Sequence, residues 1–185
     1  PSGFGTNTIP SGEAYIPSNV WKVVVAIPLG NGTALSRLSA TNRIICISIP
    51  NVTNGLSSAW TNYVTSAKQI EQDTGLAFFT AIPNFIASVY RAKIDGTPSP
   101  VISNFSPTSG AIGANVTITG TNFTAASSVW FNGASANFTV NSSNQITAAI
   151  PAGATTGAIS VITAGGLATS ATNFFVSTLP TVSAI

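Results

Sequence analysis

The last ninety residues of the chain contain no ionisable side chain. All ten charged residues lie between Glu13 and Asp95, and residues 96–185 hold no Asp, Glu, Lys, Arg, His, Cys or Tyr. Such an abrupt change of composition marks a domain boundary, and the Gly-Thr-Pro-Ser stretch at residues 96–99 has the composition of a linker. The sequence therefore predicts one domain over residues 1–95 and a second from residue 100 onward.

This charge distribution restricts what the second part binds and how it responds to pH. A module without Lys or Arg releases no phosphate counterions, so a nucleic-acid contact is expected through residues 1–95 only. Stability that depends on pH needs groups whose proton affinity changes on folding, and the second part has no such side chain. An uncharged surface also lacks electrostatic repulsion. Self-association, a glycan cover, adaptation to an acidic or variable outside medium, and the ordinary drift of Ser/Thr/Asn-rich secreted domains all fit this composition.

The residue types that are absent exclude several classes of catalytic and structural site. The chain has no His and a single Cys, which excludes His/Cys zinc sites, Ser-His-Asp and Cys-His triads, and an internal disulfide. A metal site built from carboxylates alone has only Glu13, Glu71, Asp73 and Asp95 to draw on. No apolar run reaches the roughly 18 residues of a membrane span. The chain starts at Pro1 within loop-like residues, without a signal peptide, so we expect a mature product or an excerpt of a longer chain.

Residues 100–179 alternate between short β-prone runs and turn residues. Strands are predicted at 100–105, 115–119, 128–131, 145–150, 158–162 and 173–176, with turns at Asn132-Gly133 and Gly165-Gly166. This spacing is typical of an antiparallel sandwich. Pro100-Val-Ile-Ser-Asn-Phe returns as Pro180-Thr-Val-Ser-Ala-Ile, so residues 180–185 are expected to begin a second copy of the same domain.

These residues carry a family pattern. Pro100-x-Ile-x-x-Phe-x-Pro-x-x-Gly-x-x-Gly113, Val116-x-Ile-x-Gly-x-x-Phe123 and Val129-x-Phe-Asn-Gly133 resemble the IPT/TIG family of Ig-like domains. The resemblance implies an all-β Ig-like sandwich with a spacer or stalk role in secreted bacterial proteins.

The first part has a different pattern. The β-branched runs at residues 20–27 and 43–49 predict two buried, paired strands joined by an irregular connection over 28–42. Residues 66–75 predict a short helix with a capping box from Ser66 to Gln69 and a Gly75 stop, and residues 84–93 predict a second helix capped by Asn84. The predicted class is α+β.

A second resemblance covers roughly residues 3–95. Tyr15-Ile-Pro-Ser-Asn-Val-Trp-Lys22, Ile49-Pro-Asn51 and Trp60-x-x-Tyr63 are similar to the C-terminal part of the DNA/RNA non-specific endonucleases of the ββα-metal type. The resemblance implies an incomplete ββα-metal nuclease-like fold, because the family's general-base His and its Mg²⁺-binding segment lie upstream of these residues. We therefore expect no catalytic or metal-binding residue and no cofactor in this chain, which is predicted to be inactive, and Mg²⁺ only where the parent protein supplies the catalytic half.

The candidate nucleic-acid contacts are three cations of the nuclease-like part: Lys22, Arg37 and Arg43. The alternative is that all six bases, including Lys68, Arg91 and Lys93, are ordinary solvated charges. Trp21 and Trp60 are expected in the core rather than stacked on bases, Glu71 in an ion pair with Lys68, and Cys46 as a small buried hydrophobe. Candidate glycosylation sites lie in Asn-x-Ser/Thr sequons at Asn31, Asn51, Asn115, Asn122, Asn137 and Asn141.

Two functional hypotheses follow, and a third, a carbohydrate-binding module on an enzyme, is disfavoured because no row of exposed aromatic residues stands out in the sequence. In the first, the chain is the non-catalytic portion of a secreted bacterial endonuclease-like protein whose Ig-like domain is a stalk or spacer. In the second, it is a structural subunit of an extracellular fibre or coat that reuses a nuclease-like domain and IPT/TIG repeats. Both place it outside the cell or on its surface, without a membrane span.

Overall fold

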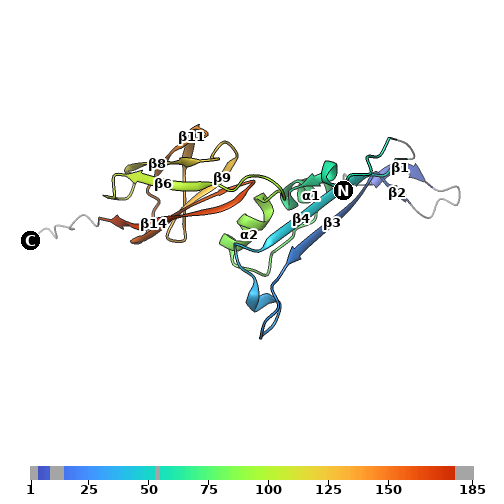
Figure 1. Cartoon of the computed structure of the whole chain (residues 1–185), viewed down its shortest axis with the longest axis horizontal. Coiled ribbons are helices and arrows are strands. Elements are labelled where there is room, and N and C mark those ends of the chain that lie inside the picture. The colour runs from blue at the N-terminus through green and yellow to red at the C-terminus, as the bar shows by residue number, and fades with distance from the viewer. Residues whose placement is uncertain (1–3, 9–14, 53–54, 178–185) are drawn as a thin grey trace, which may run out of the picture. The chain divides into compact units, whose positions relative to one another are not determined.

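The computed structural model describes residues 4–8, 15–52 and 55–177 (Figure 1). The chain divides into two compact units, Pro1–Thr97 and Pro98–Ile185.

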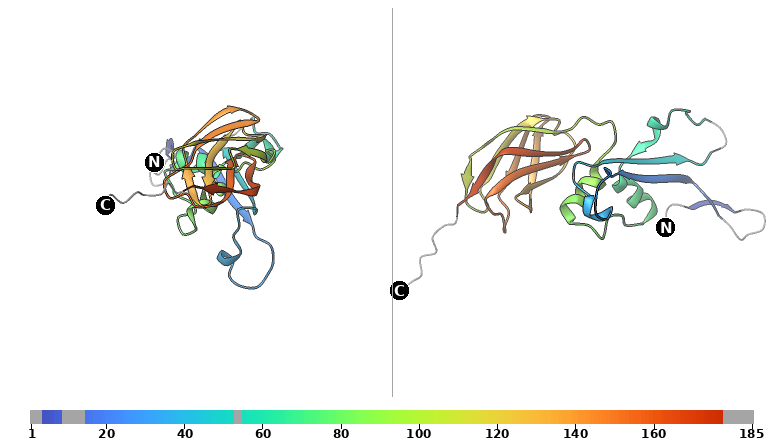
Figure 2. Two further views of the ribbon diagram at one scale, coloured as in Figure 1. Left: turned by 90° about the vertical axis from the view of Figure 1, so that its left-hand side faces the viewer. Right: turned by 60° about the horizontal axis from the view of Figure 1, so that its bottom comes forward.

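The first unit combines antiparallel strands with two helices. Strands β1 (Phe4–Thr8) and β2 (Tyr15–Pro17) pair with each other. A three-stranded sheet follows in the order β3-β4-β5, and the helices α1 and α2 lie against one side of the long β3–β4 hairpin (Figure 2). The bounds of these elements are β3 Asn19–Ala26, β4 Arg43–Pro50, β5 Val64–Thr65, α1 Ala67–Thr74 and α2 Asn84–Ala92.

The predicted first helix is confirmed with both of its ends. The Ser66 hydroxyl accepts a hydrogen bond from the Gln69 amide at 3.1 Å, which satisfies one of the amides left unpaired at a helix start. Gly75 ends the helix in the left-handed conformation, with φ 72°. The Gln69 side chain, however, donates to Asp73 rather than reaching back to the cap.

The second helix is found, but its predicted cap is wrong. Pro83 occupies the cap position and makes no side-chain hydrogen bond, and Asn84 is the first helical residue. Proline presets an extended backbone at this entry. The helix has no side-chain cap, and its packing on the rest of the unit stabilises it instead. The side chains that α2 buries are Ala87, Val89 and Tyr90.

The two long strands pair as predicted, but one of them is not buried. β3 and β4 run in continuous antiparallel register from Asn19↔Pro50 to Ala26↔Arg43. β4 buries Ile44 and Cys46, whereas Val20 on β3 is 57% exposed and Val24 is 39% exposed. The prediction of two buried strands is therefore wrong for β3, because Val20 and Val24 lie on the face of the sheet that is turned away from the helices, whereas Val23 and Val25 pack against the core.

Helices and sheet share one small core. Ile44 and Cys46 from β4 pack with Ala67 and Ile70 from α1 and with Tyr90 from α2. Phe79 packs edge-on against Tyr90, with ring centroids 5.3 Å apart. Cys46 is 1% exposed, which confirms its prediction as a buried hydrophobe.

The second unit is a sandwich of two sheets. One sheet has the order β10-β9-β13-β14-β7 and the other the order β11-β12-β8-β6. The strand pairs are antiparallel except β14 with β7. The strand bounds are β6 Val101–Ser106, β7 Ser109–Gly110, β8 Asn115–Thr121, β9 Ala126–Phe131, β10 Ala134–Ala136, β11 Phe138–Ser142, β12 Gln145–Ala149, β13 Gly157–Thr163 and β14 Gly166–Val176.

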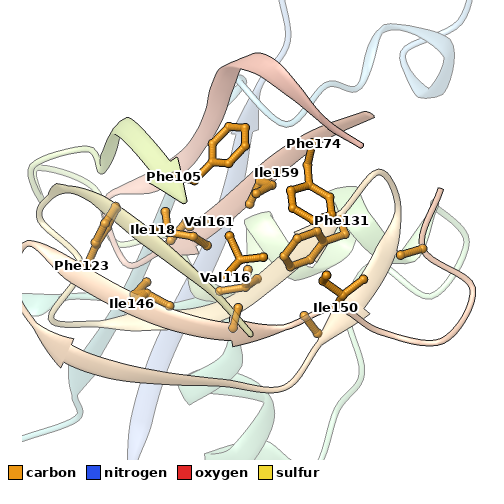
Figure 3. Packing of buried hydrophobic residues seen from close by; sticks show 14 residues of the cluster. Phe105, Val116, Ile118, Phe123, Phe131, Ile146, Ile150, Ile159, Val161 and Phe174 are labelled. Atoms are coloured by element: carbon orange, nitrogen blue, oxygen red, sulfur yellow. The ribbon is translucent and has the colours of Figure 1, made fainter. Parts of the chain in front are cut away.

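Inward-facing residues of both sheets form the core of this unit (Figure 3). Val116 and Ile118 alternate with exposed or half-buried neighbours along β8, as expected of a strand with one buried face. Phe174 packs edge-on against Phe131 at 5.3 Å between ring centroids. This apolar core is built without a single charged residue.

The turn at Asn132-Gly133 is confirmed. Both residues have positive φ, 43° and 89°, and they join β9 to β10 in a two-residue hairpin. The prediction missed β7, β10, β11 and the first half of β14. The first three are only two to five residues long, and β10 consists of Ala and Ser alone. Residues 180–185, predicted to begin a second repeat, lie outside the described residues.

Candidate nucleic-acid interface

Lys22 lies on the exposed side of β3. It pairs with Ile47 of β4 and points away from the face that packs on the helices. Its side chain is exposed, between Val20 and Val24 on the same face of the strand. Lys22 is thus an exposed cation on a strand.

Arg43 begins β4 and is held by a carboxylate. Its Nε and one terminal nitrogen donate to the two oxygens of Asp95 at 2.8 and 2.6 Å. This bidentate pair lowers the pKa of Asp95, chiefly through the hydrogen bond from Arg43, and raises the pKa of Arg43 for the same reason. The charge of Arg43 is thus already neutralised.

Arg37 is committed to its own loop. It closes the 3₁₀ helix η1 (Leu35–Arg37) and donates to the carbonyl oxygens of Gly30 and Gly32. Its Nε is buried without a hydrogen-bond partner in the described structure. Donors turned toward backbone carbonyls fix the loop after β3 rather than reach for a phosphate.

The candidate cations do not converge on one patch. Lys22 and Arg43 share the outer face of the sheet, but Lys22 pairs with Ile47, four residues along β4 from Arg43. That separation amounts to about 13 Å of strand. A groove that follows a phosphate backbone needs a denser row of free cations.

The ion-pair partner predicted for Glu71 is wrong. Glu71 on α1 pairs with Arg91 on α2, with both carboxylate oxygens 3.1 Å from the Arg91 Nε. The backbone amide of Phe78 also donates to Glu71. The expected partner, Lys68, is exposed on α1. Arg91 instead reaches the Glu71 carboxylate from α2, and the Glu71 side chain is largely sheltered from water there.

Sequence analysis missed a polar cluster beneath the loop after η1. The Tyr90 hydroxyl donates to the Ser39 carbonyl oxygen and lies 2.8 Å from the Asn42 side-chain oxygen, which also accepts from the Ser39 amide. Burial raises the pKa of Tyr90, and the hydrogen bond to Ser39 partly opposes this. Asn42 is 7% exposed. Nothing in its sequence neighbourhood distinguishes it from the many exposed Asn residues.

Both candidate stacking residues are more exposed than predicted. Trp21 is 37% exposed and meets Phe78 edge-on, and Trp60 in the 3₁₀ helix η2 (Trp60–Tyr63) is 45% exposed. The prediction that they belong to the core is wrong. Trp21 lies on β3, the edge strand of the sheet, where its side chain stays partly exposed.

Metal and acid–base chemistry find no support in the described part of the chain. Among its residues, no three metal-ligating side chains lie close enough together to hold an ion. Burial raises the pKa of the Cys46 thiol to about 11, which keeps it protonated near neutral pH. Glu13, the fourth carboxylate, lies outside the described residues.

The six candidate glycosylation sites are all exposed. Their Asn side chains lie in loops or at strand surfaces. The Asn122 side chain donates to the Ser99 carbonyl oxygen at 2.8 Å, and the Asn141 side chain donates to Gln145 and Thr147. A glycan at either site would replace these hydrogen bonds, which makes these two sites hindered acceptors.

Comparison with known proteins places the sandwich in a family. The IPT/TIG domain model matches residues 100–176, which span β6 to β14. These residues form an IPT/TIG domain. The resemblance predicted from the glycines and aromatic residues of this segment is thereby confirmed, as is the Ig-like, all-β character of the IPT/TIG domain.

One curated relative is a nuclease. The chain is 30% identical over 84 residues to a protein named "Nuclease" from Nostoc sp. strain PCC 7120, covering 45% of this chain and 30% of that protein. The chain thus spans less than a third of the relative that it matches.

Solved structures match less than half of the chain. A nutrient-binding protein from Bacteroides thetaiotaomicron is 23% identical, with a TM-score of 0.39, covering 46% of this chain and 22% of that one. SGBP-B from a xyloglucan utilization locus of Bacteroides uniformis is 25% identical, with a TM-score of 0.39, covering 46% and 24%. Within the described residues, no helix is both long and apolar enough to cross a membrane.

Proposed function

We propose that the chain is the non-catalytic portion of a secreted bacterial endonuclease-like protein, in which the IPT/TIG domain acts as a spacer. The observation that carries this proposal is the 30% identity to a nuclease over 84 residues. The resemblance of residues 3–95 to the non-specific DNA/RNA endonucleases supports it. The protein acts outside the cell or at its surface, where IPT/TIG spacers of bacterial proteins are found.

The non-catalytic role proposed for this chain follows from the residue types that the chain lacks. Hydrolysis of a phosphodiester needs a base to activate water and a cation to stabilise charge on the leaving oxygen. The chain has no His in its whole length, and of its three described carboxylates Glu71 and Asp95 are bound by arginines, while Asp73 accepts a hydrogen bond from Gln69. In this proposal, the parent protein's catalytic segment supplies the base and the Mg²⁺ site.

The first unit then supports the catalytic segment, and any contact with nucleic acid made by these residues runs through Lys22. Arg43 and Arg37 would have to release Asp95 and the loop carbonyls before binding phosphate. A substrate contact at Arg43 or Arg37 is therefore less favoured than one at Lys22.

The experiment is digestion of plasmid DNA and of single-stranded RNA by the parent protein, with Mg²⁺ and with EDTA. We expect cleavage of both polymers with Mg²⁺ and none with EDTA. A parent protein that cleaves neither polymer would overturn the proposal.

The second candidate is a subunit of an extracellular fibre or coat. It is favoured by the ninety-residue segment without ionisable side chains, which gives little repulsion between copies. Filaments of the purified chain in negatively stained electron micrographs, together with an inactive parent, would favour this function over the first.

A further inference from the structure

Three asparagines of the chain are followed directly by glycine. They are Asn31, Asn54 and Asn132. The side-chain carbonyl of an asparagine in such a pair can be attacked by the next backbone nitrogen, because glycine has no Cβ to hinder the approach. Asn54 lies outside the described residues, whereas Asn31 and Asn132 lie within them. These two differ in how firmly the fold holds their side chains.

The Asn31 side chain is not held by the fold. Asn31 and Gly32 lie in the connection between β3 and β4, and both are exposed. Gly32 has a φ of 86°, in the left-handed region. Within the described part of the chain, no hydrogen bond engages the Asn31 side chain or the Gly32 amide. The side-chain carbonyl carbon and the Gly32 nitrogen can therefore approach each other without breaking a hydrogen bond.

The hydrogen bonds that fix this loop leave the Asn31 side chain out but bring a cation close to it. Arg37 donates to the carbonyl oxygens of Gly30 and Gly32, the two residues that flank Asn31. A nearby positive charge favours the deprotonated form of a group. The guanidinium therefore favours the negative charge that develops on the Gly32 nitrogen when this nitrogen loses its proton.

The Asn132 side chain, in contrast, is locked in the hairpin between β9 and β10. Its nitrogen donates to the Thr155 hydroxyl at 2.8 Å and to the Thr156 carbonyl oxygen at 3.1 Å. A Cβ built on Gly157 would lie 2.3 Å from the Asn132 Cγ, so this carbon is packed against the Gly157 backbone. Cγ is the atom that the attack must reach. Asn132 therefore reacts only after these contacts open.

We propose that Asn31 is a site of spontaneous deamidation and that the fold protects Asn132 from the same reaction. The Gly32 nitrogen loses its proton and forms a bond to Cγ of Asn31. The bond from Cγ to the side-chain nitrogen breaks, and ammonia leaves with that proton. Water then opens the succinimide ring at either carbonyl and gives aspartate or isoaspartate. The sum is asparagine and water converted to aspartate and ammonia, without any change of oxidation state.

The reaction changes both the charge and the bonding of the β3–β4 loop. The formal net charge of the chain is +2, and the new carboxylate lowers it by one unit at neutral pH. This carboxylate forms next to the two carbonyl oxygens to which Arg37 donates, so it competes with them for the guanidinium. Aged protein therefore differs from fresh protein in a loop of the first unit, while the IPT/TIG domain stays uncharged.

The test is incubation of the folded chain in mildly alkaline buffer, followed by peptide mapping with mass spectrometry. Deamidation replaces a side-chain NH₂ with OH and so raises the mass of the peptide that contains it. We expect Asn31 to convert at least about tenfold faster than Asn132 in the folded chain. In guanidinium chloride the two rates should become similar, because the contacts of Asn132 are lost. The folded and denatured samples thus serve as each other's control.

Cleavage by hydroxylamine gives a second readout, because this reagent opens the succinimide and breaks the chain between asparagine and glycine. From the folded chain we expect a fragment that begins at Gly32 and none that begins at Gly133. The denatured chain should give both. The matched variant Asn31→Gln keeps a side-chain amide but forms the cyclic imide far more slowly, so it should lose the Gly32 fragment and keep the others.

Two results would overturn the proposal. If Asn31 stays intact in the folded chain but converts in the denatured chain, the loop restrains its side chain. If Asn31 and Asn132 convert at equal rates in the folded chain, the contacts of Asn132 give no protection. Nuclease activity enters neither readout, so failure of this inference and failure of the proposed function are distinguishable.

Discussion

At the scale of single residues, the first unit differs from the second in how its charges are used. Arg43 and Asp95 form a bidentate pair, and Arg91 grips Glu71 across the two helices. These ion pairs neutralise cations that, from the sequence alone, could have contacted a nucleic acid. Residue type alone does not show which cation is free, because the partners Asp95 and Glu71 lie 52 and 20 residues away along the chain.

The Arg43–Asp95 pair makes the first unit sensitive to acid. The pKa of Asp95 is lowered from its ordinary value of 3.8, so its contribution is fully present above that value and is lost as the pH falls through the lowered pKa. Asp95→Asn should lower the midpoint of the first unit by a few degrees at pH 7. Thermal unfolding at pH 7 and at pH 2 measures this, and the difference from wild type should disappear in acid. A difference that persists at pH 2 would show that Asp95 acts through packing.

At the scale of elements, structure was predicted best where a hydrogen bond joins residues that are close together in the sequence. Ser66 and Gly75 bound α1 as predicted because the cap and the left-handed stop are local features, although the Gln69 side chain does not complete the capping box. The Asn132-Gly133 hairpin followed for the same reason. The exposure of β3 could not be predicted, because a Val-rich run has the same sequence whether it lies at the centre of a sheet or at its edge.

The first element-scale prediction concerns the start of α1. Ser66→Ala removes the hydrogen bond to the Gln69 amide and should cost about 1 kcal/mol of the first unit's stability. Chemical denaturation followed by circular dichroism measures the loss. Ser58→Ala, at an exposed serine outside the helices, is the control. Equal effects of the two substitutions would contradict the capping role.

The second element-scale prediction concerns Gly120 on β8. A Cβ at this position would collide with the Val101 carbonyl oxygen and with the Phe123 ring. Gly120→Ala should therefore destabilise the IPT/TIG domain by about 1 to 3 kcal/mol, the usual cost of overpacking. Thr121→Ala at the exposed neighbouring position should be nearly neutral. Denaturant unfolding that left Gly120→Ala as stable as Thr121→Ala would contradict the close approach of β6 to β8.

At the scale of the whole molecule, composition gave the division into two parts, because the charged residues end at Asp95. The glycines and aromatic residues of 100–176 gave the IPT/TIG sandwich, and the family model confirms it. The candidate interface could not be obtained in the same way. Whether Lys22, Arg37 and Arg43 converge depends on register and on long-range ion pairs, which a single sequence does not contain.

The absence of ionisable side chains predicts two different pH responses in one chain. The midpoint of the IPT/TIG domain should be nearly flat from about pH 2 to pH 10, while that of the first unit falls in acid. In a Trp21→Phe/Trp60→Phe variant, Trp130 is the remaining tryptophan, and its fluorescence reports on the IPT/TIG domain. A shift of many degrees in the Trp130 transition across this range would contradict the prediction.

The central claim is that these residues support and space a hydrolytic site without containing it. Incubating plasmid DNA with a molar excess of the purified chain, in Mg²⁺ and separately in Mn²⁺, tests this most directly. The account predicts intact supercoiled DNA after hours, because neither base nor metal site is supplied. Nicked or linear DNA that appears with metal and disappears with EDTA would contradict it.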